Sequence, residues 1–167
     1  MSIFPGPQPG GGTSSASTSP EWQTATQGSN GNTLTLALAG GGGALYEIEI
    51  LVLSQTNGSL IEIELNQSAG SYSYYQQFNG VPDAGAGSYV LAGAAAAGSA
   101  AVISGRAFTS GTTAAAATYS GTTAIGVSQA FVYKTLGAPA NLTHITVKSS
   151  GANGIGAGSF VKARKIA

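Results

Sequence analysis

The stretch LYEIEILVLSQTNGSLIEIEL, residues 45–65, contains two segments in which apolar residues and glutamates alternate. Residues 45–53 place a tyrosine, two isoleucines and a valine on one side of the chain and two glutamates on the other. Residues 59–65 repeat this pattern. A period of two is typical of a β-strand with one buried face. We therefore expect two strands, each with an apolar inner face and an acidic outer face.

The dipeptide Asn57-Gly58 separates these two strands, and Asn-Gly is a strong short signal for a two-residue β-hairpin turn. Such a turn would place Glu49 opposite Asn66 in an antiparallel pair. A shifted register would instead place Glu49 opposite Glu64, and like charges directly opposite each other are unfavourable. The turn signal and the charges thus predict the same hairpin, with the two strands adjacent in one sheet.

Short alternating segments recur along the rest of the chain, separated by turns rich in glycine, serine and threonine. Their number and spacing are typical of an all-β sandwich or barrel, and no amphipathic helix of three turns is visible. We expect one antiparallel β-sandwich domain over residues 32–167, with its strands in jelly-roll order. The further strands are expected at residues 34–39, 71–78, 88–93, 100–108, 113–119, 125–134, 142–148 and 160–166.

The composition is that of a folded chain with very few charges. Charged residues make up 7% of the 167 residues and apolar residues 43%, whereas disordered chains are usually hydrophilic and highly charged. There is no cysteine, which excludes disulfides and thiolate metal sites. The N-terminus lacks the features of a signal peptide, and no stretch reaches the ~20 apolar residues of a membrane helix. We expect a protein made in a cytoplasm, with no membrane partner.

Residues 1–31 form a low-complexity segment with four prolines and a glycine triplet. Such a segment cannot bury enough apolar surface to order itself. We expect an N-terminal arm that a neighbouring subunit holds, with Ile3, Phe4 and Trp22 as its anchors. The alternative is that the segment folds back over its own domain.

The net charge is zero, but the charges are distributed unevenly along the chain. Every acidic residue lies at or before Asp83, and every basic residue lies after it. The basic residues are too dispersed to neutralise a nucleic-acid backbone, so we expect no nucleic-acid partner. We expect instead that the two halves of the chain meet through complementary strands. Glu47 and Glu49 are then candidates to contact Lys162 and Arg164, within one subunit or between subunits.

The glutamates of the two alternating strands also raise the question of catalysis or metal binding. In the expected hairpin they would share one sheet face, where two carboxylates could act in glycoside hydrolysis or several could bind a hard cation. Pairing of this acidic face with Lys148, Lys162 or Arg164 is the simpler interpretation. We therefore expect neither a catalytic site nor a metal site from this set, which comprises Glu47, Glu49, Glu62 and Glu64.

Two further patterns deserve a chemical test. GANGIGAG, residues 151–158, contains Gly-x-Gly-x-Gly, but a dinucleotide fingerprint needs a following helix, and residues 159–166 alternate as a strand. We expect a tight connection that uses positive φ, and no cofactor.

His144, the single histidine, should share a strand face with Thr146 and Lys148. A Ser-His-Asp catalytic site would have to recruit Asp83, because Asp83 is the only aspartate in the sequence.

The C-terminal stretch NLTHITVKSSGANGIGAGSFVKARKI, residues 141–166, resembles the ending of small β-sandwich virion proteins of tailed bacteriophages. In these, a strand of the type LTxITVxSS leads through a Gly/Ala loop to a closing alternating strand. The resemblance implies a jelly-roll or related sandwich in a symmetric assembly, often a homotrimer, without catalysis. The matching residues are Leu142, Ile145, Val147, Ser149, Asn153, Gly154, Gly158 and Ser159.

On this resemblance we expect a capsid decoration (cement) or head-fibre protein, made in the host cytoplasm and located in the virion. Its partners would be other copies of itself and the major capsid protein. The alternative is a receptor- or glycan-binding module of a tail fibre or tip. Aromatic faces can stack on sugars, although tyrosine also suits ordinary packing at interfaces. The candidate glycan-binding residues are Tyr72, Tyr74, Tyr75 and Phe78.

Overall fold

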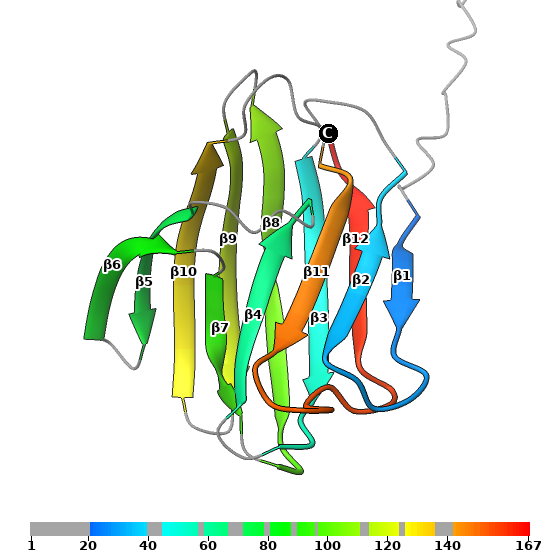
Figure 1. The fold of residues 1–167 in the computed structure, drawn as a ribbon. Coiled ribbons are helices and arrows are strands. Elements are labelled where there is room, and N and C mark those ends of the chain that lie inside the picture. Colours follow the sequence, from blue (N-terminus) through cyan, green and yellow to red (C-terminus); the bar gives the residue numbers. More distant parts are fainter. Residues whose placement is uncertain are drawn as a thin grey trace, which may run out of the picture.

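The computed structural model contains two antiparallel sheets, and none of the described residues is helical (Figure 1). The expected all-β sandwich is therefore confirmed. For the strands β5 (Tyr72–Phe78), β6 (Val81–Gly87), β7 (Val90–Ala95), β9 (Ala114–Thr123) and β10 (Gly126–Thr135) the description is limited to the backbone. The structure describes residues 21–39, 45–56, 59–66, 72–78, 81–87, 90–95, 97–110, 114–123, 126–135 and 142–167.

The larger sheet has eight strands and the smaller has four. In spatial order the large sheet comprises β1 (Gln23–Thr26), β12 (Phe160–Lys165), β3 (Leu45–Leu53), β8 (Ala100–Ser110), β9 (Ala114–Thr123), β10 (Gly126–Thr135), β5 (Tyr72–Phe78) and β6 (Val81–Gly87). The small sheet comprises β2 (Thr33–Ala37), β11 (His144–Ser149), β4 (Ser59–Leu65) and β7 (Val90–Ala95).

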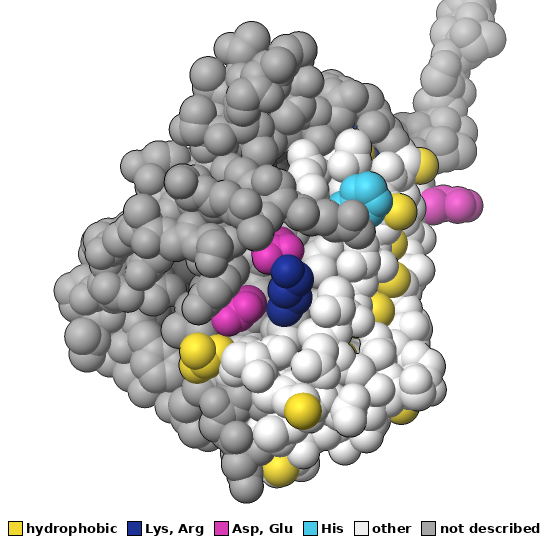
Figure 2. Space-filling view, viewed as in Figure 1, with side chains coloured by type: hydrophobic (Ala, Val, Ile, Leu, Met, Phe, Trp, Pro, Cys, Tyr) yellow, Lys and Arg dark blue, Asp and Glu magenta, His cyan; other side chains and the backbone are white. Residues whose placement is uncertain are grey.

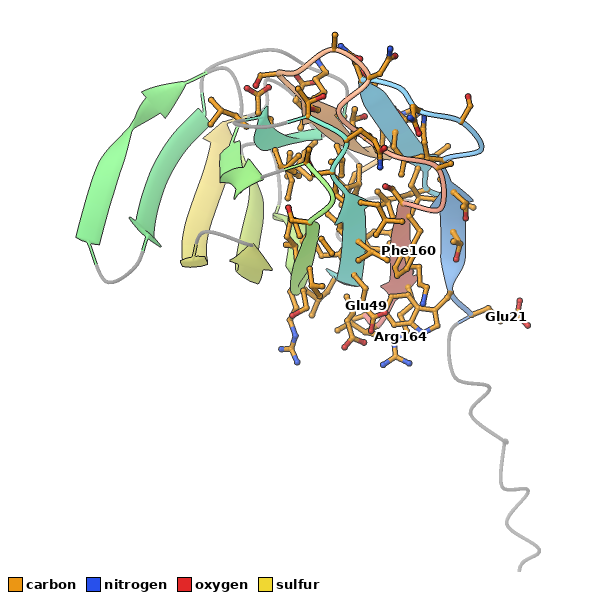
Figure 3. The ribbon with its side chains drawn as sticks, turned by 90° about the horizontal axis from the view of Figure 1, so that it is seen from below. Glu21, Glu49, Phe160 and Arg164 are labelled. Carbon is orange, nitrogen blue, oxygen red and sulfur yellow. The ribbon has the colours of Figure 1, made fainter. Side chains whose placement is uncertain are left out.

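Strands from the start of the chain pair with strands from its end in reverse order. β1 pairs with β12, β2 with β11, β3 with β8 and β4 with β7, all antiparallel. The two remaining pairs, β5–β6 and β9–β10, extend the large sheet beyond β8. Figure 3 shows β5 and β6 at the end of the large sheet farthest from β1.

The core lies between the two sheets and is built from the alternating apolar side chains. From β3 come Tyr46, Ile48, Ile50 and Val52, none more than 1% exposed. Fully burying a side chain of this kind stabilises the fold by about 1.5–3 kcal/mol. The other strands and loops contribute Leu34, Leu36, Leu38, Ile61, Ile63, Leu65, Ala101, Ile103, Ala107, Leu142, Ile145, Val147, Ile155, Val161 and Ala163.

The expected hairpin between the two glutamate-containing strands is wrong. β3 pairs with β12 and β8, whereas β4 pairs with β11 and β7, so the two strands lie in different sheets. Each strand has an apolar face, and placing the strands in opposite sheets buries both faces in the same core. The acidic faces then meet basic strands: Glu49 lies opposite Lys162 rather than Asn66. Burial and charge pairing thus override the local turn signal.

Part of the segment assigned to the N-terminal arm belongs to the sandwich. Residues 23–26 form β1 at the edge of the large sheet, and Ala25 packs against the core. Gly31 forms an isolated bridge with Ile155. Ile3 and Phe4 lie outside the described residues, so their role as anchors stays a prediction.

Candidate functional site

The outer face of the large sheet contains most of the residues predicted to contact a partner. The register aligns three cross-strand rows over β8, β3 and β12. The rows are Arg106–Glu47–Arg164, Ser104–Glu49–Lys162 and Val102–Leu51–Phe160. We call the first two of these rows the charged half of the face. We call the third row, together with Leu53, the apolar half.

Ion pairs connect β3 to β12 within the charged half. The Nε and Nη2 atoms of Arg164 lie 2.6 Å and 2.5 Å from Oε2 of Glu47. The Lys162 Nζ atom lies 3.6 Å from Oε2 of Glu49. These four side chains are 34–47% exposed, so each pair contributes only about 0–1 kcal/mol. The pairs therefore match the register of β12 against β3 but contribute little to the stability of the fold.

Trp22 lies at the edge of the charged half. The Arg164 guanidinium carbon is 4.8 Å from the centre of the Trp22 ring, and the Lys162 Nζ atom is 4.6 Å from the centre of the Phe160 ring. Cation–π contacts of this kind contribute about 0.5–1 kcal/mol at exposed sites. Arg164 thus joins the residue before β1 to Glu47 on β3. Figure 3 shows Glu49, Phe160 and Arg164 on this side of the sheet and Glu21 beyond its edge.

Five of the predicted partner-contacting residues are therefore brought together on one face of a single chain: Trp22, Glu47, Glu49, Lys162 and Arg164. Trp22, the residue directly before β1, packs on its own domain. The contacts account for the positions of these residues within the subunit. Whether the same residues also bind a partner stays a prediction.

The outer face of the small sheet contains a third ion pair. The Nζ atom of Lys148 lies 2.6 Å from Oε1 of Glu64, whose side chain is only 5% exposed. Figure 2 shows a basic side chain beside acidic side chains on this face. His144 lies on the same strand face as Thr146 and Lys148, as expected, and its Nδ1 atom is 2.9 Å from Thr143 Oγ1. The predicted pairing of acidic strands with Lys148, Lys162 and Arg164 is thus confirmed.

The prediction that the four glutamates share one face is wrong. Glu47 and Glu49 lie on the outer face of the large sheet, whereas Glu62 and Glu64 alternate with buried residues on the opposite outer face. The cause is the missing hairpin, which puts the whole core between the two pairs. Among the residues that the structure describes, no three His, Asp or Glu side chains form a group suited to a metal ion.

The glycine-rich stretch closes one end of the sandwich, and most of its backbone N–H groups are used in hydrogen bonds within the protein. A phosphate cradle needs free N–H groups, but nearly every N–H from Gly151 to Ser159 donates to a protein oxygen. The acceptors include Leu53 O, Gly31 O, Gln27 O and the side-chain oxygens of Asn30 and Asn32. The strand β12 follows the loop, so the expected tight connection is confirmed.

Close packing explains two of the four glycines, Gly154 and Gly156. A Cβ at Gly156 would lie 2.8 Å from Leu53 O, and one at Gly154 would lie 2.9 Å from Gly151 O. Between them Ile155 is fully buried and caps the core. Positive φ occurs only at Gly158 (87°) and Asn153 (53°) within this loop. The glycines thus allow the loop to approach β3.

Tyr46 is a core residue that carries a polar group into the apolar interior. Its side chain is fully buried, and its hydroxyl has no hydrogen-bond partner among the described residues. Burial raises the pKa of Tyr46 above its ordinary value, because desolvation disfavours the phenolate. In the sequence, the only sign of this buried hydroxyl is that a tyrosine occupies a position in the same alternating row as isoleucine and valine.

The backbone of β5 places the candidate glycan-binding segment between β10 and β6. The side chains of Tyr72, Tyr74, Tyr75 and Phe78 lie outside the described part of the structure. None of the described residues forms a helix long and apolar enough to cross a lipid bilayer. No protein-family model, no curated protein and no solved structure matches this chain.

Proposed function

We propose that this chain is a structural protein of a tailed-bacteriophage particle, a capsid decoration (cement) protein with a jelly-roll body and an N-terminal arm. The observation that carries the proposal is the reverse order of strand pairing, from β1–β12 to β4–β7. A jelly roll is a long antiparallel ribbon folded over into two sheets, which produces this order. Jelly rolls are common among viral capsid domains.

The loop contacts support a rigid body of the kind that a cement protein needs. At one end of the sandwich, the loop of residues 150–158 donates to or accepts from segments before β2, after β3 and at the start of β4. On the two outer faces, charged side chains pair across strands. The resemblance of residues 141–166 to phage virion proteins points in the same direction.

The arm would supply the links between subunits. Residues 1–20 contain no charged side chain and carry Ile3 and Phe4 close to the N-terminus. They precede β1, which lies at an edge of the large sheet. An arm trapped on a neighbouring copy or on the major capsid protein converts weak contacts into a firm attachment through effective concentration. A symmetric assembly such as a homotrimer would multiply this effect.

Removal of residues 1–20 tests the proposal and leaves Trp22 and β1 in place. Phage heads that lack the protein are mixed with the full chain or with the shortened chain, and binding and resistance to heating are measured. We expect the full chain to bind and stabilise heads and the shortened chain to lose most of this effect. Equal performance of the two chains would refute the arm.

Gold-labelled antibody against the chain locates it in the particle. Label over the heads is expected. Label confined to the tail tip or fibres would overturn the decoration role and favour the receptor-binding alternative, which binding to cell-surface glycans would then test.

A further inference from the structure

The apolar half of the outer face of the large sheet exposes apolar side chains directly beside the charged half. Val102 is 54% exposed, and its row continues through Leu51 and Phe160, which are partly exposed. The adjacent row contains the charged pair Glu49–Lys162. Contiguous apolar side chains with a polar rim are typical of a surface that binds another protein segment.

The chain itself contains a segment that fits this surface. Ile3 and Phe4 are adjacent apolar residues, and residues 1–20 carry no charged side chain that burial would penalise. When extended, the chain from Phe4 to Trp22 can span roughly 60 Å, which exceeds the ~13 Å between rows four residues apart on a strand. Reach alone therefore permits binding to the same copy or to a neighbour.

The direction of β1 favours a neighbour. Thr26 pairs with Phe160 in the apolar half, whereas Gln23 pairs with Ala163 toward the charged half. Followed toward the N-terminus, the chain thus leaves the sheet beside Trp22 and Arg164, away from the apolar half. To reach its own apolar half the segment would have to reverse and cross the charged half.

We propose that the apolar half of one copy binds the Ile3-Phe4 segment of a neighbouring copy. This inference rests on the proposed function, because that function makes the N-terminal segment a contact between subunits. Phe4 would pack on the row formed by Val102, Leu51 and Phe160. The contact would then be head-to-tail, since the donor segment and the acceptor face are different surfaces.

The absence of cysteine from the sequence allows a direct cross-linking test. Ser2→Cys is made in one full-length chain and Ser104→Cys, which adjoins Val102 on the same face, in a second chain of different mass. The two are mixed, on assembled particles and in solution, and oxidised. We expect a disulfide-linked heterodimer as a main product. Thr33→Cys, at an exposed position on the small sheet, replaces Ser104→Cys as the matched control and should give little heterodimer.

A second substitution tests which side chain makes the contact. Phe4→Ser in the Ser2→Cys chain should lower the heterodimer yield about tenfold, because one buried aromatic anchor commonly carries that factor or more. If the yield does not change, the segment is not held by Phe4 and the proposal is wrong. A double variant with both cysteines in one chain that cross-links only internally would overturn the neighbouring copy as the donor.

The two proposals fail separately. Chains that bind and stabilise heads but give no heterodimer, although both cysteines react with a thiol reagent, would overturn this contact and leave the decoration role intact. If the heterodimer forms but the protein is found only on tails, the contact between copies stands and the decoration role is overturned.

Discussion

β3 and β4 carry almost the same alternation of glutamate and apolar residues, yet their glutamates end in different surroundings. The Glu47 and Glu49 side chains on β3 are 37% and 47% exposed, whereas the Glu64 side chain on β4 is 5% exposed. The inner faces of the two strands are equally buried. The alternation thus determines which residues enter the core, and the neighbouring strands determine what happens to the charges.

Substitutions on the inner faces of β3 and β4 should cause the largest losses of unfolding free energy, and the losses should be similar for the two strands. Ile50→Ala on β3 and Ile63→Ala on β4 should each lower the free energy of unfolding by about 2–5 kcal/mol, because both leave a cavity in one shared core. Chemical denaturation measures the change. Val102→Ala, at an exposed position on β8, is the control and should cost no more than about 0.5 kcal/mol. A small loss for only one of the two isoleucines would contradict a common core.

The outer faces should respond differently to loss of a lysine. Lys148→Met leaves the Glu64 carboxylate buried without its 2.6 Å partner and should cost about 1–3 kcal/mol of the free energy of unfolding. Lys162→Met removes a partner from the exposed Glu49, at 3.6 Å, and should cost about 0–1 kcal/mol.

Adding Glu64→Gln to the Lys148→Met chain removes the unpaired charge, so it should restore part of the stability. Thermal or chemical denaturation of the single and double variants measures this coupling. Equal losses for the two lysine variants would show that the difference in burial between β3 and β4 has no energetic consequence.

The loop of residues 150–158, which connects β11 to β12 and contacts the end of β3 and the start of β4, should tolerate change poorly. Gly156→Ala would place a Cβ 2.8 Å from Leu53 O at the end of β3, so the loop must shift, at a cost of about 1–3 kcal/mol. Gly28→Ala is the matched control, since a Cβ there meets nothing within 4 Å. Equal melting temperatures for the two variants would show that the loop does not press on β3.

The smallest effect is expected at Tyr46, the one polar side chain on the inner face of β3. Tyr46→Phe removes a buried hydroxyl that has no partner among the described residues, so it should change stability by about 1 kcal/mol or less, in the stabilising direction. Urea denaturation at neutral pH measures this difference.

The pH dependence of Tyr46 follows from its raised pKa. The folded state holds the phenolic proton more tightly than the unfolded chain, whose pKa is about 10. Its contribution is therefore fully present below pH 10 and is lost as the pH rises through the folded pKa. Above pH 10, wild-type stability should fall more steeply than that of Tyr46→Phe. Parallel curves would contradict the desolvation of Tyr46.

Features that depend on the chain's own alternation or charge could be predicted from the sequence. Period-two patterns identified the inner faces of β3 and β4 and the alternation of β12. The separation of acidic from basic residues predicted that the acidic strands contact Lys148, Lys162 and Arg164, but not which glutamate each of them meets. These predictions succeed because burial and charge act over the whole fold.

The sheet partners could not be predicted in the same way. Asn57-Gly58 favours a hairpin locally, but this preference is smaller than the gain from burying two apolar faces against each other. The burial of Glu64 was also missed, since it depends on how β11 and the elements around β4 are placed. Because the sheet partners were predicted wrongly, Glu47 and Glu62 were expected on one face, whereas they lie on opposite outer faces.

The position of β12 has a consequence for synthesis. The last strand of the chain lies between β1 and β3, so β1 has no neighbour in its sheet until residues 160–165 have left the ribosome. Every one of the four reverse-order pairs closes a long loop, and such high contact order slows folding. Nascent chains will therefore expose apolar strands until β12 has emerged, and deletion of residues 160–167 should give aggregation rather than a smaller folded protein.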